Sequence, residues 1–374
     1  MSGWARARLQ VLQRQAIALG PGSKKATNNQ MDQSLKARGA ELRAAQLFPM
    51  KGAQRGLKMD AEAGQAPANW GEGDIGDQTG KVVFITGANI GLGFEAARML
   101  SERGARILMA CRDESKAREA MAAIKRRNGR AALDFVGLDL ADLEQVAGVP
   151  EHVKTLGVSS IDVLLNNAGV MMPPKRQETK QGYELQFGVN HLAHFALTRL
   201  LFPMLAPQAR VVTVASIADR RGDIRWDDPQ WRKGYTPSAS YGQSKTANLL
   251  FTLELSRRLQ AAGSAIMALG AHPGVAMTNL ATSSTLGPWL WLVKPLVAIG
   301  IGPKVQSPAM GALPEVYAAV GAVEPGAYFG PAQRTFGPPA RAESHKAQHS
   351  GDAAAARRLW SLSEELTGAK FEVV

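Results

Sequence analysis

Residues 82–93 read VVFITGANIGLG, an apolar run followed at once by a loop that holds three glycines. The first five residues, Val82–Thr86, are rich in β-branched side chains and predict a buried strand of a parallel sheet. Apolar residues at Phe94, Ala97 and Leu100 then predict a helix. A glycine loop between a strand and a helix lets backbone N–H groups approach a pyrophosphate, and the helix N-terminus favours its negative charge. The stretch therefore predicts a dinucleotide-binding fold.

The rest of the chain continues this alternation of strands and helices. Further strands are predicted at 106–110, 132–138, 161–165, 210–215 and 265–271. Helices are predicted at 114–127 and 143–156, within 182–205, and at 240–261. Such alternation implies right-handed βαβ units, so we expect an α/β fold with a single Rossmann-type, doubly wound parallel sheet and helices on both faces. A ligand is expected at the carboxyl ends of the strands.

Composition and cysteine content narrow the class of protein. The 374 residues are 45% hydrophobic and 20% charged, which is typical of a soluble globular chain and excludes a disordered, collagen-like or coiled-coil protein. The single cysteine, Cys111, excludes a disulfide framework and a multi-cysteine zinc site. We interpret Cys111 as a packed strand residue rather than a nucleophile.

The positive charge is concentrated near the start of the chain. Residues 1–58 hold eleven Lys and Arg but only two acids, so they carry nine of the net twelve positive charges. Residues 1–68 lack an apolar period, and we expect a basic, disordered extension before a folded domain at 69–374. A mis-called start, with Met59 as the true one, is an alternative. The location is expected to be cytoplasmic, although residues 1–58 also resemble an organelle transit peptide.

Two further features bear on partners. Residues 285–303 are apolar but are interrupted by Pro288, Lys294 and Pro295, so they are too short to span a bilayer. We interpret them as an apolar lid over a pocket, with contact to a membrane surface as the alternative. Nucleic-acid binding is not expected, because no basic stripe with aromatic residues follows the extension. The sequence leaves the oligomeric state open.

The end of the second predicted strand indicates the type of cofactor. It reads MACRD at 109–113, with no acid before Arg112. An acid here would bind the ribose 2′-hydroxyl of NAD, whereas an arginine accommodates the 2′-phosphate of NADP. We therefore predict NADP(H). In the alternative, Arg112 is only a surface residue and Asp113 is a helix N-cap.

Four ordered motifs complete the pattern: the glycine loop, NNAG at 166–169, YGQSK at 241–245, and HPG at 272–274 followed by Thr278. Together they resemble the short-chain dehydrogenase/reductase family over residues 70–370. ACR at 110–112, GYELQFGVNH at 182–191 and the 25-residue interval before Tyr241 are similar to its retinol dehydrogenase-like branch.

Tyr241 and Lys245 are the candidate acid/base pair. Four residues apart on a helix, they share one face. A nearby ammonium favours the phenolate and makes tyrosine a usable general acid/base. The resemblance also implies that Lys245 holds the nicotinamide ribose, that Ser216 orients the substrate oxygen, and that Asn190 helps to hold a water in a proton relay. In the alternative, Tyr241 and Lys245 are an exposed pair without function.

The resemblance also completes the candidate cofactor site. It implies that Asp139 and Leu140 meet the adenine, that 167–169 line the riboses, and that 273, 274 and 278 face the carboxamide. Ile90 departs from the Ser or Thr frequent in relatives, so weaker cofactor binding is expected. The full set is Gly87, Asn89, Ile90, Gly91, Gly93, Arg112, Asp139, Leu140, Asn167, Ala168, Gly169, Tyr241, Lys245, Pro273, Gly274 and Thr278.

Together with these residues, the resemblance implies an NADP-dependent enzyme that interconverts an alcohol and a carbonyl on a small lipophilic substrate. One alternative is a protochlorophyllide-reductase-like enzyme that reduces a C=C bond. Another is a dinucleotide-sensing regulatory module without turnover. His191 and His194 are three apart, but no third ligand accompanies them, so no metal site is predicted.

Overall fold

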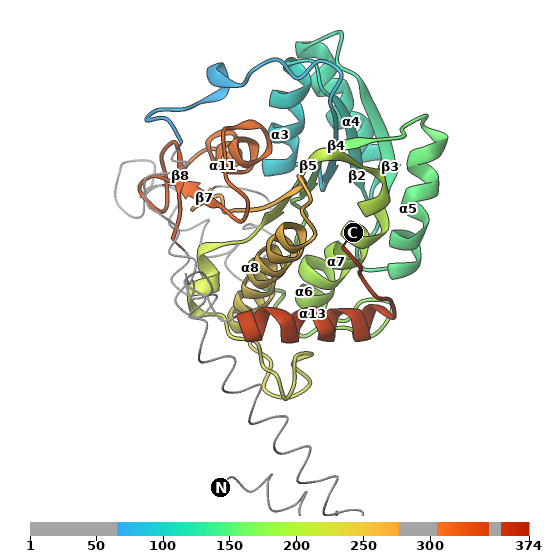
Figure 1. Ribbon diagram of the computed structural model, residues 1–374, viewed down its shortest axis with the longest axis vertical. Coiled ribbons are helices and arrows are strands. Elements are labelled where there is room, and N and C mark those ends of the chain that lie inside the picture. Colours follow the sequence, from blue (N-terminus) through green and yellow to red (C-terminus); the bar gives the residue numbers. More distant parts are fainter. Residues whose placement is uncertain (1–65, 277–304, 344–352, 374) are drawn as a thin grey trace, which may run out of the picture. The chain divides into compact units, whose positions relative to one another are not determined.

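The computed structural model describes residues 66–276, 305–343 and 353–373, and its centre is one eight-stranded sheet (Figure 1). The strand order is β3-β2-β1-β4-β5-β6-β7-β8. The first seven pair in parallel, and β8 is antiparallel to β7. The predicted doubly wound α/β sheet is thus confirmed. The strands are β1 (Val82–Thr86), β2 (Arg106–Cys111), β3 (Leu133–Gly137), β4 (Ile161–Asn166), β5 (Leu205–Val214), β6 (Met267–Ala271), β7 (Tyr328–Pro331) and β8 (Pro339–Arg341).

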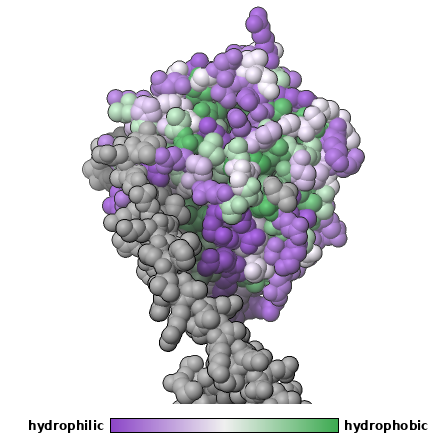
Figure 2. Space-filling view, viewed as in Figure 1, coloured by the Kyte–Doolittle hydropathy of each residue, from purple (hydrophilic) through white to green (hydrophobic). Residues whose placement is uncertain are grey.

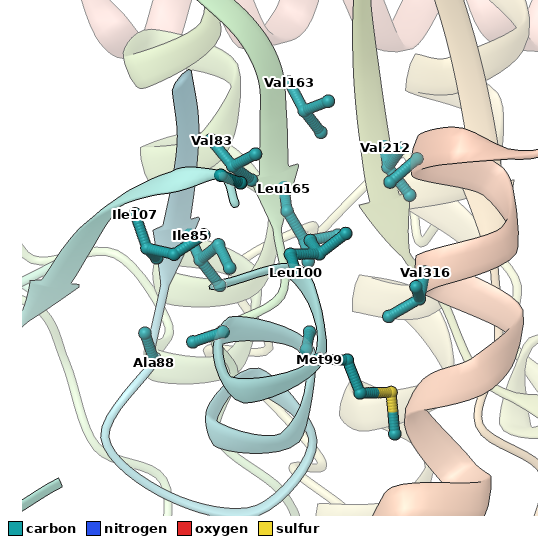
Figure 3. Packing of buried hydrophobic residues seen from close by; sticks show 14 of the residues in the cluster. Val83, Ile85, Ala88, Met99, Leu100, Ile107, Val163, Leu165, Val212 and Val316 are labelled. Atoms are coloured by element: carbon teal, nitrogen blue, oxygen red, sulfur yellow. The ribbon is translucent and has the colours of Figure 1, made fainter. Parts of the chain in front are cut away.

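Helices cover both faces of the sheet because successive strand residues point to opposite sides. One face packs on α3 (Gly91–Glu102), α4 (Glu114–Arg127) and α11 (Pro308–Val320). Figure 3 shows this core, in which Val83 and Ile85 of β1 lie near Leu100 of α3. The other face packs on α5 (Leu143–Thr155), α7 (Ala193–Leu201), α8 (Pro237–Ala261) and α13 (Ala353–Thr367).

Several predicted boundaries shift in the structure. The helix expected within 182–205 is divided into α6 (Leu185–Phe187), the π-helix η2 (Gly188–Leu192) and α7. Strand β5 begins at Leu205, earlier than the predicted start at 210, because Leu205 pairs with Ile161 beyond an irregularity in the register. Pro207 lies within this stretch, and because proline is uncommon inside strands, the sequence pattern did not predict the first part of β5.

The folded core includes residues before the first strand. Trp70 and Ile75 are buried, and the Arg98 guanidinium of α3 pairs with the carboxylates of Glu72, Glu95 and Glu102. The extension proposed at 1–58, the lid at 285–303 and Thr278 lie outside the described residues, and the boundary at 68 stays a prediction.

The described surface mixes hydrophilic residues with smaller apolar areas on the face shown in Figure 2. Within 66–276, 305–343 and 353–373, no helix is long and apolar enough to cross a bilayer. The large exposed apolar side chains of this part are Ile90, which is 49% exposed, and Met310. Ile90 lies in the glycine loop, where the candidate site begins.

Candidate active site

The glycine loop is shaped by the two strands beside it. Gly87 has a φ of +67°, a conformation that only glycine adopts without strain. A Cβ on Gly93 would lie 2.6 Å from the Gly87 carbonyl oxygen and 2.5 Å from Asn167 Nδ2, so no larger residue fits there. Ile90 is the N-cap of α3 and makes no side-chain capping bond. The first N–H groups of the helix therefore have no cap from Ile90 and suit an anion.

A pocket of about 370 Å³ opens along this loop. Ten of the predicted cofactor residues line it: Gly87, Asn89, Ile90, Gly91, Arg112, Asp139, Leu140, Asn167, Ala168 and Gly169. Gly93 lies beneath the loop as a packing residue. Sequence reasoning missed several lining residues, among them Leu92, Lys116, Val170, Leu185 and Val189. These come from the elements that follow β1, β2 and β4, and no local motif marks them.

Two cations line one end of the pocket. Arg112 follows β2 directly, and Lys116 lies in the first turn of α4. Asp113 is the N-cap of α4, since its carboxylate accepts from the backbone N–H of Lys116 at 3.1 Å. Asp113 also pairs with the Lys116 ammonium at 3.3 Å. Arg112 is exposed and lines the pocket.

Cys111 ends β2 and is buried beside the glycine loop. Burial raises the pKa of its thiol to about 11, although hydrogen bonds with the backbone of Ala88 and Asn89 oppose this. A thiol with this pKa is almost entirely protonated at neutral pH and is a poor nucleophile. The geometry supports the interpretation of Cys111 as a packed residue.

Tyr241 and Lys245 lie together on α8, and both are buried. The Lys245 ammonium lies 5.8 Å from the centre of the Tyr241 ring and donates a hydrogen bond to the Val214 carbonyl at 2.9 Å. The alternative of an exposed pair does not describe this arrangement. Residue 245 is only 3% exposed, which places a charged group next to the phenol in a poorly solvated site.

The protonation states differ from the simple expectation of a phenolate. Burial raises the pKa of Tyr241 to about 12, and a hydrogen bond with the Ser216 hydroxyl opposes this shift. Burial lowers the pKa of Lys245 to about 8, and the carboxyl of Glu315 opposes that shift. At neutral pH Tyr241 is therefore a neutral phenol, the form that donates a proton. Lys245 is still mostly charged and can stabilise the phenolate that proton donation leaves behind.

Ser216 follows β5 and begins a short 3-10 helix. Its hydroxyl accepts from the Ala218 backbone N–H at 3.2 Å and hydrogen-bonds with Tyr241. These contacts fix the hydroxyl close to the phenol. Ser216 and Tyr241 can therefore contact the same oxygen atom of a substrate.

Asn190 lies in the π-helix η2. Its Oδ1 accepts from the Val170 N–H at 2.7 Å, and its Nδ2 donates to the Val170 carbonyl at 3.0 Å and to Ser244 Oγ at 2.9 Å. A Cβ on Gly169 would lie 3.1 Å from Asn190 Oδ1 and 3.7 Å from Lys245 Nζ. Gly169, which lines the pocket, therefore lies next to both Asn190 and Lys245.

The loop after β6 packs against residues 331–335, and the backbone N–H of Val275 donates to the Thr335 carbonyl at 2.8 Å. Gly274 has a φ of +63°, and a Cβ there would lie 2.4 Å from the Thr335 carbonyl oxygen. The Pro273 carbonyl accepts from Gln306 Nε2 at 2.6 Å. Pro273 and Gly274 do not line the 370 Å³ pocket, and Thr278 lies outside the described residues.

Glu315 of α11 is a buried carboxyl that sequence reasoning missed. It is 2% exposed, and its Oε1 has no hydrogen-bond partner among the described residues. Burial raises its pKa to about 8, and the Lys245 ammonium opposes this shift. Only the fold brings this carboxyl near Lys245, because 70 positions separate the two in sequence.

His191 and His194 each lie within hydrogen-bond distance of a different hydroxyl side chain. His191 Nε2 lies 2.8 Å from Ser363 Oγ, whereas His194 Nε2 lies 3.0 Å from Thr86 Oγ1. Throughout the described part of the chain, no group of three His, Cys, Asp or Glu side chains could hold a metal ion.

Comparison with known proteins identifies the family of the chain. The family model for short chain dehydrogenases matches residues 81–288. The chain therefore belongs to the short-chain dehydrogenase family of oxidoreductases.

Within the family it is retinol dehydrogenase-like. It is 40% identical to retinol dehydrogenase 12 of Mus musculus over 298 residues, 78% of this chain and 88% of that one. It is 39% identical to retinol dehydrogenase 13 of Homo sapiens over 306 residues, 77% and 85% of the two chains.

Solved structures support the fold. An uncharacterized protein from Mycobacterium paratuberculosis is 40% identical with a TM-score of 0.67, covering 82% of this chain and all of that one. A structure described as an NAD(P)-dependent gluconate 5-dehydrogenase from Beutenbergia cavernae, with bound NADP, is 25% identical with a TM-score of 0.53. That match covers 68% of this chain and 96% of the other.

Proposed function

We propose that this protein is an NADP(H)-dependent oxidoreductase that interconverts an alcohol and a carbonyl on a small lipophilic substrate, with Tyr241 as the general acid/base. The observation that carries the proposal is the convergence of Ser216, Tyr241 and Lys245 beside a pocket built on a glycine loop.

The glycine loop supports the binding of a nicotinamide dinucleotide through its pyrophosphate. The Gly87–Gly93 packing leaves room for a pyrophosphate to approach the backbone, and α3 begins at this point without a side-chain cap. The related gluconate 5-dehydrogenase structure contains NADP. When bound, the cofactor supplies or accepts the hydride.

The charges at the end of β2 favour NADP(H) over NAD(H). Arg112 and Lys116 line the pocket where the second strand ends, and Ala110 and Cys111 offer no carboxylate before them. Asp113 also lines the pocket but is engaged with Lys116 as a cap and an ion pair. A 2′-phosphate would therefore meet two cations, with Arg112 as its forked partner.

The catalytic residues have separate tasks in reduction. Ser216 donates a hydrogen bond that orients the substrate oxygen. Tyr241 gives its phenolic proton to that oxygen, which becomes the hydroxyl of the product. The positive charge of Lys245 stabilises the phenolate left behind, and Asn190 holds the adjacent backbone of Val170 in place. In oxidation each proton transfer runs in reverse.

The relatives named retinol dehydrogenases make a retinoid or a similar lipophilic aldehyde the first substrate class to test. Reduction of a C=C bond is less well supported. An enzyme that resembles protochlorophyllide reductase would place a cysteine near its substrate. The single cysteine of the sequence, Cys111, lies beside the glycine loop with its pKa raised to about 11.

Oxidation of NADPH, followed at 340 nm, would test the proposal against retinal, other aldehydes, ketones, steroids and quinones. We expect turnover with at least one lipophilic carbonyl and formation of the matching alcohol. If the protein binds NADPH but reduces none of these carbonyls, the proposed activity is wrong and a sensing module without turnover is favoured.

A further inference from the structure

His194 lies in the first turn of α7, four residues after Asn190, and its side chain is buried, with 1% exposed. Both of its ring nitrogens have partners. Nδ1 lies 3.0 Å from the carbonyl oxygen of Asn190, and Nε2 lies 3.0 Å from the hydroxyl of Thr86. Thr86 ends β1, just before the glycine loop. One imidazole thus connects the candidate catalytic Asn190 with the first strand of the sheet.

These contacts determine where the protons lie. A carbonyl can only accept, so Nδ1 must carry the hydrogen that bonds to Asn190. Burial lowers the pKa of His194 to about 4, so the ring is neutral near pH 7 and its Nε2 carries no hydrogen. The Thr86 hydroxyl has two acceptors within reach, His194 Nε2 at 3.0 Å and the Leu165 carbonyl at 3.4 Å. The shorter contact assigns its single hydrogen to Nε2.

The remaining capacity of Thr86 is also used. Its oxygen accepts from the backbone N–H groups of Asn167 and Ala168, each at 2.9 Å. The result is a chain of hydrogen bonds in which each group donates to the next one. It runs from the amides of Asn167 and Ala168 through Thr86 and His194 to the Asn190 carbonyl.

The chain ends at an irregular point of the backbone. Asn190 lies inside the π-helix η2, in which the N–H of Ala193 reaches back to Gly188. π-turns are rare and often occur at functional sites. Here the π-turn directs the Asn190 amide toward Val170 and Ser244. The neutral imidazole of His194 donates to the backbone carbonyl of the same residue at 3.0 Å.

We propose that His194 is a positioning residue for the reaction. With its hydrogen on Nδ1, it stabilises the π-turn that places Asn190 beside Lys245. Through Thr86, it also connects that turn to the cofactor-binding segment Asn167–Ala168. This inference rests on the proposed function, because it assigns His194 a role in that same site. Substitution of His194 is therefore expected to lower kcat without a matching fall in melting temperature.

His191 offers a matched control. It is equally buried, lies three residues earlier and also makes a hydrogen bond through Nε2. Its partner is Ser363 of α13, whereas the partner of His194 is Thr86 of β1. If burial of a histidine in this segment were all that mattered, substitutions at the two positions would have similar effects on turnover.

The first test compares three variants. His194→Leu removes both hydrogen bonds, His194→Asn keeps an N–H donor near the position of Nδ1, and His191→Leu is the control. Melting temperature, the Kd for NADPH, kcat and KM are measured on each. We expect His194→Leu to lower kcat at least about tenfold more than His191→Leu at a similar melting temperature, and His194→Asn to recover part of the loss. Equal kcat values for the two leucine variants would overturn the proposal.

The second test needs neither a variant nor turnover. Nitrogen-15 NMR of the histidine-labelled protein reports which ring nitrogen carries the hydrogen. We expect His194 to be neutral at pH 6–7 with its hydrogen on Nδ1. A hydrogen on Nε2, or a charged ring, would overturn the proposed chain. Because this signal does not depend on substrate, it separates a failure of this inference from a failure of the proposed enzymatic function.

Discussion

Replacing Arg112 with alanine is expected to weaken NADPH binding about tenfold and to leave NADH binding within about twofold of the wild type. The reason is the position of Arg112 at the end of β2, where it lines the pocket with Lys116 and Asp113. Lys116 is already paired with Asp113, so Arg112 is expected to make the larger contribution to binding a 2′-phosphate.

The magnitude follows from the exposure of the site. Hydrogen bonds to charged groups contribute about 1.5–3 kcal/mol. Arg112 is exposed, so screening by solvent favours the lower end, about 1.5 kcal/mol, which is about a tenfold change in Kd. Lys116→Ala should have a smaller effect, because Asp113 shares its charge.

Fluorescence titration of the wild type and of Arg112→Ala with NADPH and NADH gives the four dissociation constants. Lys116→Ala is measured in the same way. If Arg112→Ala weakens both cofactors by the same factor, Arg112 does not read the phosphate and the reasoning from the strand end is refuted.

Three further predictions concern stability and packing. Burial lowers the pKa of His191 to about 3, so the unfolded chain takes up a proton on this side chain below pH 6.5 while the folded chain does not, and the free energy of unfolding falls with the pH. His191→Gln should therefore lose about 2 kcal/mol less of its free energy of unfolding between pH 7 and pH 5 than the wild type, as measured by urea unfolding. Gly169→Ala should lower kcat about tenfold, because the added Cβ would displace Asn190. In the control Gly148→Ala, the added Cβ meets no atom within 4 Å, so kcat should be unchanged. Equal kcat values for the two variants would contradict this prediction. A chain that starts at Met59 should keep its activity and melt within a few degrees of the full chain, and a large drop would show that residues 1–58 support the domain.

The parts of the fold that depend on local pattern could be predicted from the sequence. The strand, loop and helix at 82–102 follow from an apolar run, three glycines and helical spacing. Tyr241 and Lys245 could be paired because four residues span one helical turn. Their burial could not be predicted, and it is burial that raises the pKa of Tyr241 to about 12.

Features that depend on distant contacts were missed. Strand β7 is four residues long and contains Gly330 and Pro331, so it has no readable period. The π-turn at Asn190 has the apolar pattern of an ordinary helix. His194 and Thr86 are 108 positions apart, and their hydrogen bond exists only once β1 and α7 pack together. Glu315 likewise meets Lys245 only through the fold.

The central claim is that Tyr241 supplies the proton in carbonyl reduction at this site. The most direct measurement compares kcat and the Kd for NADPH in the wild type and in Tyr241→Phe, with whichever carbonyl the wild type reduces. We expect kcat to fall at least about 100-fold, as for loss of a general acid, and the Kd for NADPH to stay within a few-fold of the wild-type value. A Tyr241→Phe enzyme that turns over within a few-fold of the wild type would contradict it.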